Sequence, residues 1–167
     1  MTRRILLALL AFTAAVLAGA VVPLTLSTIH QERSSFIQAT AGMVRADATV
    51  AQSGLEGSPN EPLFQVIIQA RQAGDGLLIL TSSLSGNGSY QRPRPLVNIG
   101  MPAGDWIQLA DEADRQAWLA SSPGQPVQPI TETTRSRVIA AMPVYAHGEG
   151  PLVGTVILAR SDRKSVV

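Results

Sequence analysis

The sequence predicts an α+β protein in which an N-terminal transmembrane helix continues into a long helix that packs on an antiparallel sheet. An uncharged run from Ile5 to Ile29 follows Arg3 and Arg4. Helical spacing of apolar residues then continues to about residue 55 without a helix stop. The last third of the chain consists of β-branched apolar runs separated by turn residues. Helices are therefore expected in the first half, and most of the sheet in the second.

The uncharged run predicts a membrane anchor. A hydrocarbon core about 30 Å thick requires roughly 20 helical residues, and Ile5 to Leu24 provides that length. The alternative is a cleaved export signal, because Ala18-Gly19-Ala20 has the small-x-small pattern of a cleavage site. The uncharged run continues beyond this point, which favours the anchor. Since both arginines lie on the short N-terminal side, we expect residues 1–4 in the cytoplasm and residues 30–160 outside it.

Composition limits what the exported part can be. The residues after Ile29 are enough for one domain. Arg3 and Arg4 account for two of the 13 basic residues, which leaves 11 against 12 acidic residues. This balance contains no basic stripe and argues against a nucleic-acid partner. The absence of cysteine excludes disulfides, thiolate zinc sites and thiol nucleophiles. Stability must therefore come from an aliphatic core.

Two helices are expected to open the exported domain. From Ser27 to about Ser53 the apolar residues keep helical spacing, with Arg45 and Asp47 on other faces. Because nothing separates this stretch from the apolar run, the two are predicted to form one helix. A second helix is expected to begin at Glu61-Pro62 and to end at Gly74-Asp75-Gly76.

The remaining elements are mainly strands. The continuous apolar run Leu77 to Leu80 predicts a central strand, and Ser85 to Ser89 predicts a turn. The other expected elements are a strand at Ser89 to Arg94 that Pro93 weakens, a short strand at Leu96 to Met101, a helix at Trp106 to Ala120, and three adjacent antiparallel strands at Ile130 to Arg135, Arg137 to Tyr145 and Leu152 to Ala159.

Two segments carry a resemblance to a known family. They are GLLILTSSLSGNGS and the closing hairpin RVIAAMPVYAHGEGPLVGTVILARS, in which Met142-Pro143-Val144 precedes the turn and Val153-Gly154-Thr155 follows it. With the anchor and the long helix, this pattern resembles the extracytoplasmic PAS-like (PDC or Cache) sensor domain of bacterial membrane-bound two-component sensor histidine kinases. The resemblance implies a PAS-like sheet, signal reception, a homodimer with adjacent first helices, and a small-molecule ligand on the concave face of the sheet.

The resemblance covers only the sensing part of such a receptor. A complete sensor kinase has a second membrane helix and a cytoplasmic catalytic region. Here Arg160 to Val167 is only a short polar stretch, and residues 161–167 are interpreted as a truncated tail after the sensor domain. We therefore expect no kinase activity, and no enzyme activity, in these residues. The alternative is an exported or membrane-anchored envelope binding or structural protein with no signalling role.

Three residues are candidates for ligand binding. Arg135 and Arg137 lie two residues apart, so both point to one face if that stretch is extended. An arginine fork suits a small anion, and Tyr145 lies on the same parity as Arg137. The competing interpretation is that these are solvated side chains at the edge of the sheet.

No catalytic residue, metal site or cofactor is predicted. His30 and His147 lie far apart in the sequence, and no cluster of ligands accompanies either of them. His30 is expected at the membrane interface and His147 in a solvated hairpin turn. The expected partners are the membrane, a second copy of the chain and a small molecule.

Overall fold

The computed structural model describes residues 2–56, 61–84, 90–101, 105–119, 128–134, 137–146 and 152–161. Its first element is a single helix, α1 (Thr2–Leu55), which confirms the predicted continuity of the apolar run with the helix that follows. The chain divides into two compact units, Met1–Phe36 and Ile37–Val167. The expected turn at Ser85 to Ser89 and His147 lie outside the described residues.

The first unit contains an apolar stretch of helix whose large side chains are exposed. It is long and apolar enough to cross a bilayer by length and composition, and its most apolar window is not buried inside the protein. Phe12 and Leu24 are 70% and 69% exposed. The hydroxyls of Thr25 and Thr28 donate hydrogen bonds to the carbonyl oxygens of Val21 and Leu24, at 3.0 and 2.9 Å. These bonds satisfy polar groups that a hydrocarbon environment would leave without partners.

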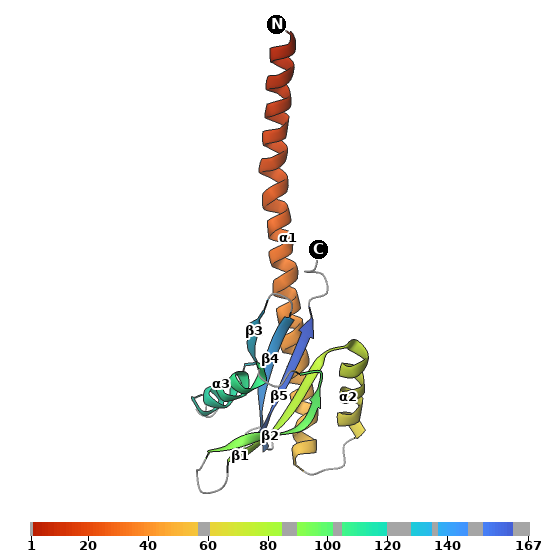
Figure 1. Ribbon diagram of the computed structural model, residues 1–167, viewed down its shortest axis with the longest axis vertical. Helices are drawn as coiled ribbons and strands as arrows, with labels where there is room; N and C mark the ends of the chain where they lie inside the picture. Colours follow the sequence, from red (N-terminus) through yellow and green to blue (C-terminus); the bar gives the residue numbers. More distant parts are fainter. Residues whose placement is uncertain are drawn as a thin grey trace. The chain divides into compact units, whose positions relative to one another are not determined.

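The second unit is built on an antiparallel sheet of five strands in the order β2-β1-β5-β4-β3 (Figure 1). The fold is α+β, as predicted. Besides α1, its elements are α2 (Glu61–Ala73), β1 (Gly76–Leu84), β2 (Tyr90–Ile99), α3 (Asp105–Leu119), β3 (Ile130–Thr133), β4 (Arg137–Tyr145) and β5 (Leu152–Ser161). The three strands of the last third are adjacent and antiparallel, as expected.

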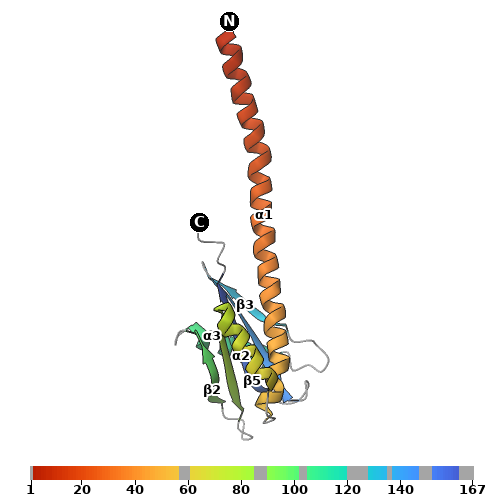
Figure 2. The same cartoon turned by 90° about the vertical axis from the view of Figure 1, so that its right-hand side faces the viewer.

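Both faces of the sheet are covered by helices, and Figure 2 shows α1 and α2 beside the strands. On one face, α1 and α2 pack against alternate residues of the central strands; this core comprises Val44, Ala48, Ala51, Ala70, Leu77, Ile79, Ala140, Val144, Val156 and Leu158. On the other face α3 packs against the residues of opposite parity; this core comprises Leu78, Leu80, Met101, Leu109, Ala110, Ala113, Ile139, Ala141, Ile157 and Ala159. The continuous apolar run of β1 follows from this arrangement, because all its side chains are buried.

The prediction of two short strands between residues 89 and 101 is wrong. The structure has one strand there, β2, at the edge of the sheet. An edge strand has one side free of ladder hydrogen bonds, so it tolerates Pro93 and Pro95, which cannot donate. The pairing with β1 shifts between Ile79 and Leu80, where Pro95 faces Leu80. The prolines therefore interrupt the register of the strand without ending it.

Candidate functional site

The structure does not bring the predicted ligand-binding residues together. Arg137 is exposed at the first position of β4, and Tyr145 is half-buried at the last. They lie eight positions apart on the strand, which corresponds to about 27 Å, so one small ligand does not reach both side chains. Arg135 lies outside the described residues. The predicted extension of β3 to Arg135 is wrong, since the strand ends at Thr133.

Two hydrogen bonds connect the residue after β3 with the first residue of β4. The backbone N–H of Thr134 donates to the carbonyl oxygen of Arg137 at 2.8 Å. The backbone N–H of Arg137 donates in return to Thr134 Oγ1 at 3.1 Å. These two bonds join Thr134, which follows β3, to the first residue of β4, so Arg137 stands at one end of the sheet. This placement agrees with the alternative of a solvated side chain at the sheet margin.

The structure instead gathers three charged residues where α1 meets the rest of the domain: Asp47 from α1, Asp75 from the turn between α2 and β1, and Arg160 near the end of β5. We call them the Asp47 cluster. Arg160 Nε lies 3.2 Å from Asp75 Oδ2, and the two side chains are only 22% and 15% exposed. A partly buried ion pair of this kind is sensitive to any further charge placed beside it.

Asp47 supplies that further charge. Burial raises the pKa of Asp47 to about 6, and the nearby carboxylate of Asp75 adds to the increase. The prediction that Asp47 lies away from the buried face of the helix is wrong. It is half-buried and sits one turn after Val44 and directly before Ala48, both of which are in the core. A spacing of three residues from a core position could have indicated this placement.

Asp75 is held in place by the end of α2. Gly74 has a φ of 71°, the left-handed conformation that favours glycine after a helix. The N–H of Asp75 donates to the carbonyl oxygen of Ala70 at 2.9 Å, and the N–H of Gly74 donates to that of Arg71 at 3.3 Å. This pair of bonds is a Schellman motif, which fixes the direction in which the chain leaves the helix. The carboxylate of Asp75 is therefore presented by a defined backbone.

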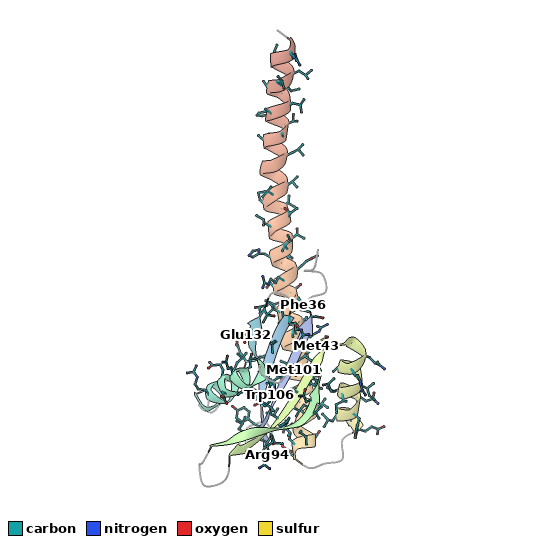
Figure 3. The ribbon with its side chains drawn as sticks, in the orientation of Figure 1. Phe36, Met43, Arg94, Met101, Trp106 and Glu132 are labelled. Carbon is teal, nitrogen blue, oxygen red and sulfur yellow. The ribbon has the colours of Figure 1, made fainter. Side chains whose placement is uncertain are left out.

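The opposite face of the sheet holds one notable polar atom. The side chain of Trp106, in the first turn of α3, packs against the core that includes Met101 and Leu109, and Figure 3 labels Trp106 and Met101. Its Nε1 is buried and has no hydrogen-bond partner. A buried indole N–H normally has a partner, so this donor is available to an acceptor group.

Within the described ranges, no three His, Asp or Glu side chains are grouped closely enough to hold a metal ion. The Asp47 cluster thus has the chemistry of a proton-binding and ion-pairing site. Comparison of the chain with protein-family models, curated proteins and solved structures gives no match. The functional argument therefore rests on the residues themselves.

Proposed function

We propose that this chain is the extracytoplasmic sensing region of a two-component sensor histidine kinase, with α1 as both its membrane anchor and its output helix. One observation carries the proposal: a single helix, Thr2–Leu55, contains an apolar stretch long enough to cross a bilayer and three side chains of the domain core, Val44, Ala48 and Ala51. The element that would cross the membrane is thus also a structural part of the domain.

The packing of α1 supports a role in transmission. Val44 and Ala51 are 0% and 1% exposed, and Ala48 is 5% exposed. Small residues allow a helix to lie close to a sheet, and close-packed contacts move between discrete arrangements more readily than they deform. A change on this face of the sheet would therefore displace α1 as a unit.

The order of elements and the closing hairpin also support the proposal. β4 and β5, which carry the motifs of the resemblance, are neighbours, and β5 lies between β1 and β4 in the sheet. Their buried residues contribute to both cores. A small-molecule ligand on either face would therefore act on strands that contact the helices of both sides.

The orientation can be tested by chemical labelling, because the chain contains no cysteine. Single cysteines at the exposed positions Ala39 and Thr131 are expected to react with a membrane-impermeant maleimide in intact cells. A cysteine at Thr2, on the other side of the apolar run, is expected to react only after the membrane is permeabilised. Protection of Ala39→Cys and Thr131→Cys in intact cells would contradict the proposed orientation.

Transmission can be tested in a chimera in which a second membrane helix and a histidine kinase follow Val167. Inserting one residue after Phe36 rotates the two parts of α1 by about 100°, whereas inserting seven restores the phase to within roughly 20°. We expect the single insertion to change autophosphorylation in membrane vesicles and the seven-residue insertion to leave it near the uninserted level. Equal output from all three chimeras would favour the envelope protein with no signalling role.

A further inference from the structure

We propose that Asp47, Asp75 and Arg160 form a proton-responsive contact between α1 and the sheet, and that acidification of the compartment facing the domain is a signal that this contact receives. The signalling part of the inference rests on the proposed function. The contact itself does not, because it is a property of the second unit alone.

The three side chains come from three different elements that meet on one face of the sheet. Arg160 pairs with Val138 across the ladder, and both lie on the parity that packs against α1. Asp75 directly precedes Gly76, whose partner on β5 is Ala159. A change in the charge of Asp47 therefore acts on the turn after α2 and on the end of β5 at once.

The charges in the cluster do not balance when Asp47 is ionised. Arg160 forms an ion pair with Asp75, and an ionised Asp47 then adds a second negative charge close to the same pair. Like charges in a partly buried site repel, and each charge also loses hydration there. Protonation of Asp47 removes both costs, and it leaves the pair of Asp75 and Arg160 intact.

Among the described residues of the neighbouring elements, three other arginines do not offset this imbalance. Arg45, two residues before Asp47 on α1, is exposed. Arg71, in the last turn of α2, is also exposed. Arg137, at the start of β4, is exposed and has the parity of the residues that pack against α3. The causes of the raised pKa of Asp47 are burial and Asp75, in that order.

The consequence is a contact with two states. The proton affinity of Asp47 is about a hundred-fold above that of an exposed aspartate, because the pKa rises from 3.8 to about 6. Below this pH the neutral side chain allows α1 to pack closely beside Asp75. Above this pH the ionised carboxylate is more stable in water. The part of α1 around Asp47 therefore moves away from the turn that holds Asp75.

The contact can be measured as a distance in the full chain reconstituted in lipid nanodiscs. Cysteines introduced at Met43 of α1 and Thr131 of β3 carry the two spin labels. Both positions are exposed, and the natural chain contains no cysteine that would also react. Dilution with unlabelled chain limits the signal to pairs within one molecule. We expect the distance distribution to change with pH, with a midpoint near pH 6.

Variants distinguish the cluster from a general effect of pH. Asp47→Asn is expected to hold the acid distribution at every pH, because its side chain is permanently neutral. Glu132→Gln, which neutralises an exposed carboxylate on β3, is expected to leave the transition unchanged. The proposal would be overturned if the transition persists in Asp47→Asn. It would also be overturned if the distance distribution of the protein with Asp47 unchanged is the same at pH 4.5 and pH 8.

The signalling part is separated by repeating the titration on the kinase chimera. If the distance changes but autophosphorylation does not respond to insertions or to pH, the contact stands and the proposed function fails. If autophosphorylation responds to the insertions but its pH profile is the same with and without Asp47→Asn, the proposed function stands and the proton signal fails.

Discussion

Leu55, the last residue of α1, packs directly against Gly154 of β5. A Cβ added at Gly154 would lie 2.7 Å from Leu55 Cδ1, and it would also overlap the carbonyl oxygen of Leu80 on the neighbouring strand. Real Cβ atoms do not make contacts this short. Glycine is therefore required here mainly by the carbonyl oxygen of Leu80, a backbone atom, and the side chain of Leu55 covers the same position. The glycine of the motif Val153-Gly154-Thr155 thus has a steric cause.

Gly154→Ala is expected to destabilise the domain by about 1–3 kcal/mol, because the backbone atom of Leu80 cannot move away as a flexible side chain could. The matched control is Gly42→Ala on the exposed face of α1, where a Cβ meets nothing within 4 Å. That change is expected to stabilise the helix by about 0.5–1 kcal/mol. Denaturant unfolding of the full chain in detergent measures both, and equal effects from the two substitutions would contradict the steric explanation.

The free energy of unfolding is expected to depend on pH through Asp47. Its pKa is raised in the folded state from 3.8 to about 6, so the folded chain binds more protons between these values. The contribution is therefore fully present below pH 3.8 and is lost as the pH rises through 6. After allowance for partial exposure, Asp47→Asn should be more stable than the unaltered chain by about 1 kcal/mol at pH 7.5, with no difference at pH 3.5.

Burial limits which residues of α1 can contact a second copy of the chain. Val44 and Ala48 belong to the core, at 0% and 5% exposed, so they cannot face a second copy while the domain is folded. Ala39 and Ala46 are exposed on the same helix. If first helices pair in a dimer, cysteines at Ala39 or Ala46 are expected to form symmetric crosslinks in membranes, and a cysteine at Ala48 is not. Crosslinking at Ala48 alone would show that the helix packs differently from the structure described here.

Trp106→Phe is expected to change the free energy of unfolding by no more than about 1 kcal/mol. The substitution loses some apolar contact but also removes a buried donor, Nε1, that has no partner. Leu109→Ala, on the same helix at a position 4% exposed, is expected to cost about 2–5 kcal/mol and serves as the comparison. A loss from Trp106→Phe as large as that from Leu109→Ala would indicate that the indole N–H is satisfied in solution.

Periodicity and turn chemistry were sufficient to predict most of the fold. The continuity of α1, the start of α2 at Glu61 and the adjacency of the last three strands all follow from local patterns, and the structure confirms them. The single strand β2 was missed because the penalty that Pro93 and Pro95 impose depends on whether a strand lies at the edge, which is a property of the whole sheet.

The Asp47 cluster could not be predicted in the same way. Its members are far apart in the sequence, and Asp75 and Arg160 meet only because β1 and β5 pair with Gly76 opposite Ala159. The expected ligand residues failed to converge for the opposite reason. Arg137 and Tyr145 have the same parity on one strand, but they lie at its two ends.

The coupling between Asp47 and the buried ion pair can be measured by a double-mutant cycle at pH 7.5. Arg160→Gln leaves Asp75 without its partner at 3.2 Å and next to a second carboxylate, so we expect a loss of about 1–3 kcal/mol in the free energy of unfolding. Adding Asp47→Asn removes one of the two repelling charges and is expected to recover about half of that loss. At pH 4.5, where Asp47 is protonated in the folded chain, the recovery should disappear. Additive effects at both pH values would show that Asp47 does not interact with the pair.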